Sequence, residues 1–292
     1  MTKANGSGLF FLEPVLEIVE TIIFTSCVDS EIPSSMIMVA PSGVAKSMAI
    51  KHYVSESLHP TDSISSQGLY DLAARDQKQE IRFLMIPDMN PTLSRKSATV
   101  QSTIANLLSF TADGTVRIDD GRAQKECKHA PVGLVTAATP DIYNAQAKKW
   151  FALGLRRRIL PIFFHYSRDT TRKLQALVRD QQIHSSSPPT VKLKIGFKAR
   201  PAIPEPMTHK IEALSLSFSM MLGKLQNYDE SDAKKRWKVR DVVPISPQIT
   251  LMNLARAHAL RRNRKAAICD EEDYGFLCKF LDFCDPEHPK EI

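Results

Sequence analysis

The octapeptide 40–47, Ala-Pro-Ser-Gly-Val-Ala-Lys-Ser, ends in a lysine and a hydroxyl residue. The pattern G-x-x-x-x-G-K-[ST] binds nucleotide phosphates: backbone N–H groups surround a phosphate, the lysine supplies charge and the hydroxyl ligates Mg²⁺. Lys46 and Ser47 match this pattern, whereas Ala40 and Ala45 replace its glycines. The loop is therefore expected to bind ATP or ADP with Mg²⁺; an ordinary strand-to-helix turn is the alternative. The residues expected to line the site are Pro41, Ser42, Gly43, Val44, Ala45, Lys46, Ser47 and Met48.

Apolar runs and turn residues predict the elements that must position this loop. Residues 36–40 read as a buried strand that ends in Pro-Ser-Gly turn chemistry, and residues 46–58 show a helical pattern. Because strands and helices alternate along the first half, we expect an α/β fold with a parallel sheet and helices on its faces. Further strands are predicted at 81–86, 115–118, 132–138 and 159–164, and helices at 14–24, 97–110, 207–225, 247–261 and 270–283.

The loop resembles the P-loop of the minichromosome maintenance (MCM) helicases, a branch of the AAA+ ATPases. The loop of that branch ends in Ala-Lys-Ser preceded by Pro-x-Gly or Pro-Gly-Val, and residues 41–47 fit this form. The alanine before Lys46 is therefore no sign of inactivity. The resemblance covers about residues 35–165 and 244–283. It implies a P-loop AAA+ parallel-sheet core with a small C-terminal helical lid domain.

A single carboxylate, Asp88, follows the strand expected at 81–86. AAA+ proteins deliver an Asp-Glu pair there, in which the Asp holds Mg²⁺ and the Glu orients the attacking water. Here Pro87 and Met89 flank Asp88. The resemblance implies that Asp88 ligates Mg²⁺ with Ser47, which leaves no catalytic Glu, or that it stands one place along as a shortened base. The alternative is that Asp88 only forms a turn at the end of the strand.

Other catalytic candidates follow from the same resemblance. Thr139, after the strand at 132–138, corresponds to the sensor-1 residue that touches the γ-phosphate or its water; capping the next helix is an alternative role. The stretch 154–161 is similar to the family segment whose arginine reaches a neighbouring subunit's γ-phosphate. Arg158 is the closest match and Arg157 the second, and an exposed basic cluster is the alternative.

A hairpin is expected around Asp113-Gly114, at the place where MCM-type proteins project a hairpin that grips DNA. Basic residues there make it a candidate nucleic-acid contact, and a solvated charged loop is the alternative reading. The basic residues are Arg117, Arg122, Lys125 and Lys128.

The C-terminal helices resemble the lid of MCM-like ATPases through 254–261 followed by the acidic start at 270–273. The family's sensor-2 arginine has no counterpart in 245–249, and His258 is expected to pack. The predicted organisation is a nucleotide-binding α/β core at 1–168, a connecting helix and Pro/Ser-rich linker or insertion at 169–206, and a helical lid at 207–292.

Composition bounds the class of protein. The 292 residues carry 39 Lys+Arg and 32 Asp+Glu, a net charge of +7, with 43% hydrophobic residues. These values exclude a collagenous, coiled-coil or wholly disordered chain, and no apolar stretch approaches the roughly 18 residues of a membrane span. The N-terminus has no signal-peptide pattern, and five cysteines without CxxC spacing suit a reducing compartment. A cytoplasmic protein without membrane contact is expected.

These observations lead to a functional hypothesis. The chain is expected to be an oligomeric AAA+ ATP-binding protein, a ring or filament, that hydrolyses ATP slowly. It would act on DNA or a DNA-bound machine in replication, transposition or phage-type remodelling, with which the basic excess agrees. The alternatives are a hydrolysis-deficient pseudo-ATPase that scaffolds protein partners, and a MoxR-like AAA+ chaperone acting on protein.

Overall fold

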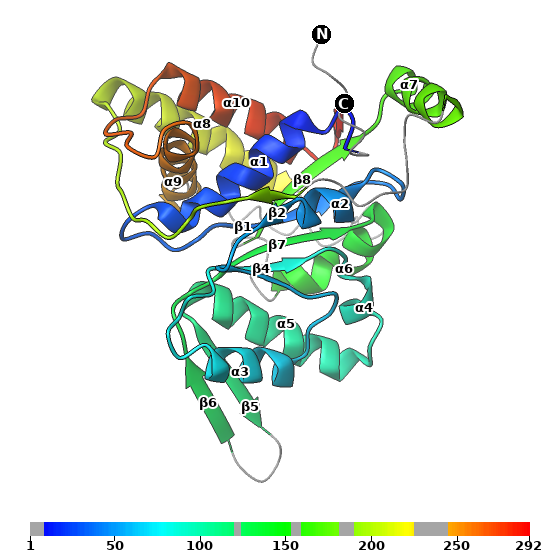
Figure 1. The fold of residues 1–292 in the computed structure, drawn as a ribbon, viewed down its shortest axis with the longest axis vertical. Helices are drawn as coiled ribbons and strands as arrows, with labels where there is room; N and C mark the ends of the chain where they lie inside the picture. The colour runs from blue at the N-terminus through cyan, green and yellow to red at the C-terminus, as the bar shows by residue number, and fades with distance from the viewer. Residues whose placement is uncertain (1–8, 120–123, 153–158, 181–189, 225–244) are drawn as a thin grey trace, which may run out of the picture.

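The fold is known from a computed structural model, which describes residues 9–119, 124–152, 159–180, 190–224 and 245–292 (Figure 1). The strands are β1 (Ser35–Val39), β2 (Tyr53–Val54), β3 (Leu58–Pro60), β4 (Phe83–Ile86), β5 (Thr115–Asp119), β6 (Gln124–Lys128), β7 (Gly133–Ala138), β8 (Ile159–His165), β9 (Val191–Lys192) and β10 (Lys290–Glu291). The helices are α1 (Glu13–Phe24), α2 (Lys46–Lys51), α3 (Ser66–Arg75), α4 (Asn90–Leu93), α5 (Ser97–Ala112), α6 (Pro140–Ala152), α7 (Arg168–Arg179), α8 (Glu205–Lys224), α9 (Ile245–Arg262) and α10 (Glu271–Cys284).

A six-stranded sheet organises the molecule, in the order β10-β8-β1-β7-β4-β3, and every neighbouring pair in it is parallel. The predicted α/β fold with a parallel sheet and C-terminal helices is confirmed. The expected strands at 36–40, 81–86, 132–138 and 159–164 correspond to β1, β4, β7 and β8. The hairpin β5–β6 stands apart from the sheet as an antiparallel pair.

Side chains alternate between the two faces of the sheet, and each face carries its own hydrophobic cluster. In β1, Met36 and Met38 join the cluster that includes α1, α2 and the C-terminal helices. Ile37 and Val39 join the cluster that includes α3, α5 and α6. We call these the α1 face and the α5 face; they lie above and below the sheet in Figure 1. Burial on both faces explains why the strands read as unbroken apolar runs.

The helix expected over 46–58 is wrong beyond Lys51, where α2 ends. Tyr53 instead begins β2, and its hydroxyl donates to the Leu16 carbonyl of α1 at 3.0 Å. Leu58 begins β3 and pairs with Phe83 of β4. Pairing with neighbouring segments thus overrides the local helical pattern, as it commonly does for aromatic and β-branched residues.

The helices α8, α9 and α10 pack on the α1 face and share one hydrophobic cluster with α1 and the sheet. The proposed division of the chain into core, linker and lid stays a prediction. The described part of the predicted linker, 190–206, runs extended at first, and Leu193 and Ile195 are buried. Its Ala199 exchanges backbone hydrogen bonds of 2.9 Å with Cys27 and Asp29. None of the helices in the described ranges is long and apolar enough to cross a membrane.

A largely buried network of charged and polar side chains joins α1 to α9 and α10. His258 stacks on Phe276 with ring centroids 4.4 Å apart, which agrees with its expected packing role. The imidazole also lies 2.7 Å from the fully buried carboxylate of Asp273. On the other side, Arg261 of α9 bonds to Glu17 of α1 at 2.5 Å. The network satisfies charges that would otherwise be costly to bury.

Candidate nucleotide-binding site

The loop between β1 and α2 contains two residues with positive φ, Gly43 and Ala45. Gly43 adopts φ 87°, a conformation that favours glycine. Ala45 caps α2 with φ 48° and ψ 23°, in the left-handed region. An L-residue pays roughly 1–2 kcal/mol for this conformation. Val44 is buried and Pro41, Ser42 and Gly43 are exposed, so the loop presents its backbone outward and anchors itself by one side chain.

The strain at Ala45 gives a direct prediction. Ala45→Gly is expected to raise the free energy of unfolding by about 0.5–1 kcal/mol, because glycine adopts φ 48° without the Cβ clash. Urea unfolding would measure the change. Ala49→Gly in the interior of α2 is the matched control and is expected to destabilise by about 1 kcal/mol or more. Equal losses in both variants would contradict a strained Ala45.

The Lys46 side chain makes two hydrogen bonds to the loop. Its ammonium donates to the carbonyls of Ala40 at 2.5 Å and Pro41 at 2.7 Å. Burial lowers the pKa of Lys46, and the nearby charge of Asp88 opposes that shift. The loop therefore presents a fixed cation close to the end of β4, which suits an anionic ligand such as a phosphate chain.

The end of β4 lies against the first turn of α2. The Ser47 hydroxyl donates to the Pro87 carbonyl at 3.1 Å. The Asp88 carboxylate accepts from the backbone N–H of Asn90 at 2.9 Å, an Asx turn that starts α4. The backbone N–H of Met89 donates to Ala137 of β7 at 3.0 Å. The structure thus brings Lys46, Ser47 and Asp88 together.

Thr139 directly follows β7 at the same edge of the sheet. Its carbonyl accepts from the N–H of Tyr143 at 2.9 Å in the first turn of α6, and the residue is half-buried. This bond puts Thr139 at the N-cap position of α6, in agreement with the alternative capping role. Ala40 N–H reaches the Ala138 carbonyl at 3.4 Å, which sets the loop beside the end of β7.

The topology makes this edge of the sheet a candidate position for ligand binding. After β1 the chain crosses to β3 at the far edge and returns through β4 and β7, then passes to β8 on the other side of β1. The helix after β1 lies on the α1 face, and the helix after β7 lies on the α5 face. In open α/β sheets, ligands bind outside the carboxyl ends of the strands at such a switch point.

The position of Met89 does not suit the Glu of an Asp-Glu pair. Its side chain is 3% exposed and belongs to the cluster of the α5 face. A carboxylate at position 89 would enter that cluster rather than face the loop. This burial was not predictable from the sequence, because the apolar run ends at Ile86.

Met89→Glu is accordingly expected to lower the free energy of unfolding by about 2–4 kcal/mol, since it buries a carboxyl among apolar side chains. Met89→Leu, which keeps the volume, should cost less than about 1.5 kcal/mol. Both follow from urea unfolding. A fully stable Met89→Glu protein would show that position 89 faces solvent or the loop.

Three of the basic candidates lie on the hairpin β5–β6. Arg117 of β5 is exposed and pairs with Glu126 of β6 at 2.8 Å. Lys125 and Lys128 lie on β6. This hairpin extends away from α2 and the loop (Figure 1). The predicted residues Arg122, Arg157 and Arg158 lie outside the described ranges.

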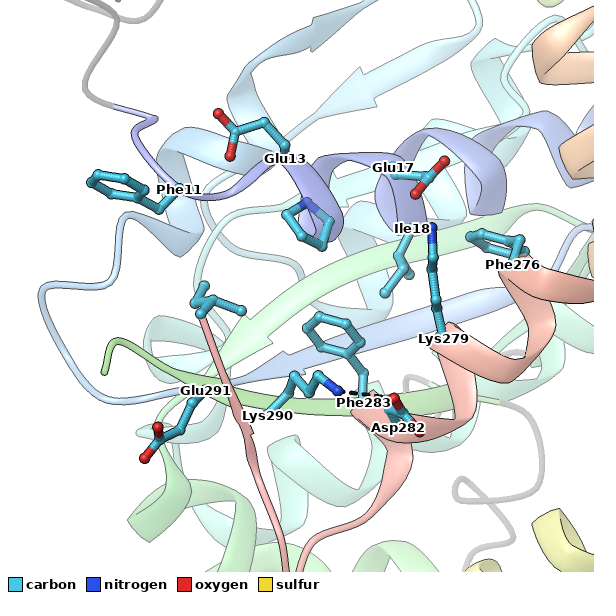
Figure 2. A pocket seen from close by; sticks show the side chains of 12 residues that line it. Phe11, Glu13, Glu17, Ile18, Phe276, Lys279, Asp282, Phe283, Lys290 and Glu291 are labelled. Atoms are coloured by element: carbon cyan, nitrogen blue, oxygen red, sulfur yellow. Dashed lines mark hydrogen bonds and ion pairs between the residues drawn. The ribbon is translucent and has the colours of Figure 1, made fainter. Parts of the chain in front are cut away.

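A separate groove of about 370 Å³ lies between α1, α10 and β10 (Figure 2). Apolar side chains such as Ile18 and Phe283 form its base, and Lys290 pairs with Asp282 at its rim at 2.9 Å. None of the loop residues 40–48 lines it. The groove is therefore distinct from the loop site.

Comparisons with known proteins give no assignment: no protein-family model matches the chain, and a search of curated proteins found no match.

Proposed function

We propose that the loop 40–47 binds ATP or ADP with Mg²⁺ and that the protein is an ATPase of the P-loop AAA+ class, closest to the MCM-like branch. The observation that carries the proposal is the meeting of Lys46, Ser47 and Asp88 at the switch point of a parallel sheet. A cation, a hydroxyl and a carboxylate are the groups that a phosphate chain and its metal require.

The side chains present fit Mg²⁺ carried by a nucleotide. Mg²⁺ prefers oxygen ligands, keeps several waters and uses substrate phosphates as further ligands. The Ser47 hydroxyl and the Pro87 carbonyl are oxygen donors 3.1 Å apart. Bound Mg²⁺ would neutralise charge on the β- and γ-phosphates during transfer. In this chain Lys46 would orient the phosphates, and Thr139 would stand near the terminal phosphate.

We further propose that the protein works as a homo-oligomer on DNA or a DNA-bound machine, with slow hydrolysis. The exposed basic side chains of the hairpin support a nucleic-acid partner, since phosphate contacts by Arg and Lys supply most non-specific affinity. Filter binding at two salt concentrations, with ATPase assays with and without DNA, tests this. Turnover that DNA leaves unchanged would contradict it.

One observation favours a second candidate function. Burial of Met89 removes the place from which a family glutamate would orient water. This favours a pseudo-ATPase whose bound nucleotide holds an assembly together. Nucleotide-dependent assembly without turnover would select this second function.

A further inference from the structure

Helix α7 is amphipathic and stands apart from the other described helices (Figure 1). Leu174, Leu177 and Val178 lie at spacings of three and four residues and therefore share one face of the helix. Among the described residues, none of these three side chains belongs to either hydrophobic cluster, and Val178 is 60% exposed. Within α7 only Thr170 is buried. The apolar face of α7 is therefore not packed into the core of its own chain.

The length of α7 favours a packing partner for this face. The helix has 12 residues, and isolated helices shorter than about 12–15 residues are only marginally stable in water, because most helical stability comes from packing. The Ser167 hydroxyl accepts from the Thr170 N–H at 3.0 Å, but this cap satisfies only the first turn. We therefore expect the apolar face to pack against a surface outside its own chain.

The groove between α1, α10 and β10 offers a surface that matches α7 (Figure 2). Its base is apolar and includes Ile18 and Phe283. Its lining also contains four carboxylates and two ammonium groups, those of Glu13, Glu17, Asp282, Glu291, Lys279 and Lys290. Helix α7 carries four basic residues and one acidic residue. The helix and the groove thus pair an apolar face with an apolar base and have opposite net charges, which favours their association.

The helix and the groove adjoin each other in one chain. The N–H of Ser167 donates to the carbonyl of Ile292, a groove residue, at 3.0 Å. The Lys173 ammonium lies 5.7 Å from the centre of the ring of Phe11, which also lines the groove. These contacts hold α7 beside its own groove while Val178 stays exposed. Two copies related by a twofold axis could therefore each place α7 in the groove of the other, in the isologous arrangement that is commonest among homodimers.

We propose that the protein forms a twofold dimer in which α7 of each copy lies in the groove of the other copy. Leu174, Leu177 and Val178 then cover the apolar base of the groove. The contact occurs twice in such a dimer, which matters because a specific interface generally buries more than about 1,000 Å². None of the loop residues 40–48 lines the groove, so the dimer does not require nucleotide. This inference therefore goes beyond the proposed ATPase function.

Sedimentation equilibrium of the full chain without nucleotide tests the helix side of this contact. We expect the wild-type protein to be a dimer. Val178→Glu should raise its dissociation constant at least tenfold, because a carboxylate then enters an apolar contact. Met220→Glu on α8 is the matched control, since that side chain is 69% exposed on another helix. The control should stay within about twofold of wild type.

Pro14→Lys tests the groove side. Pro14 is exposed and lines the groove, so a lysine there removes apolar surface and repels a basic helix. We expect the dissociation constant to rise at least tenfold here too. In an equimolar mixture, the Val178→Glu protein supplies an intact groove and the Pro14→Lys protein supplies an intact helix. The mixture should therefore form more dimer than either variant alone.

Urea unfolding shows whether each variant is folded, and Val178→Glu with its control decides the question if Pro14→Lys does not fold. A wild-type protein that is monomeric without nucleotide at high micromolar concentration would overturn the inference. A Val178→Glu dimer as tight as wild type would overturn it as well. A mixture that forms no more dimer than the separate variants would show that α7 and the groove do not meet. ATP binding is measured separately by calorimetry, so failure of the dimer and failure of the proposed function are distinguishable.

Discussion

Replacing Lys46 by alanine is expected to weaken the binding of ATP and ADP by roughly 10²- to 10⁴-fold. The ammonium lies between the Ala40 and Pro41 carbonyls, and in the proposed site its removal deletes the cation that contacts the phosphates. Hydrogen bonds from a charged donor contribute about 1.5–3 kcal/mol each, and about 1.4 kcal/mol corresponds to a tenfold change in affinity. Calorimetric titration with each nucleotide measures the loss.

Lys51 offers a matched control on the same helix. It lies at the C-terminal end of α2, exposed, and pairs with exposed Asp62 at 3.5 Å. Lys51→Ala removes the same charge from the protein, and nucleotide affinity should stay within about twofold, since an exposed pair contributes little. An equal loss of nucleotide affinity in the two variants would show that the effect of Lys46→Ala comes from net charge alone. Unchanged affinity in Lys46→Ala would remove the loop as the binding site.

The second large effect is expected at Arg158. Ile159, which directly follows it, begins β8 and pairs with Ser35 at the start of β1. Five residues of strand, about 17 Å, separate that edge of the sheet from the loop at Ala40. An arginine attached there is expected to serve the ATP site of a neighbouring subunit. Arg158→Ala should keep nucleotide affinity and lose turnover by about 10³- to 10⁵-fold, the usual worth of such an arginine.

Mixing two variants tests whether Arg158 acts at the ATP site of a neighbouring subunit or at that of its own subunit. A Lys46→Ala subunit still carries Arg158, and an Arg158→Ala subunit still carries an intact loop. Equimolar mixing of the two inactive proteins should restore part of the ATPase rate, because some interfaces then hold both intact halves. Arg157→Ala is the matched neighbour and should have the smaller effect. A protein that stays monomeric with saturating ATP and DNA, by light scattering, would contradict the shared site.

The parallel sheet was predictable because its strands are buried on both faces. Such strands appear as short apolar runs, and Met36 to Val39 or Phe83 to Ile86 need no tertiary information to be recognised. The end of α2 was not predictable, since Tyr53 and Leu58 leave the helix to pair with segments distant in the sequence. Helix α3 was not predicted from the sequence. Its start is fixed by the Ser65 hydroxyl, which accepts a hydrogen bond from the Gly68 N–H.

The candidate site was likewise predictable only in part. Residue types and spacing identified Lys46, Ser47 and Asp88, because phosphate chemistry restricts which side chains can serve. The sequence left the role of Asp88 open between metal ligand and base. The structure adds the contact of the Ser47 hydroxyl with the Pro87 carbonyl and the burial of Met89. Each is a relation between segments, which spacing alone does not encode.

The ion-pair network between α1 and the C-terminal helices has a mechanical consequence. Pulling α10 away from α9 would strand the Asp273 carboxylate, which is fully buried against His258. Breaking a buried pair in this way costs about 3–5 kcal/mol. Separation of these helices is therefore expected to be rare at 25 °C, and α9, α10 and α1 should move together as one rigid unit. In the oligomer that we propose, a change at the loop would therefore displace these three helices as a whole.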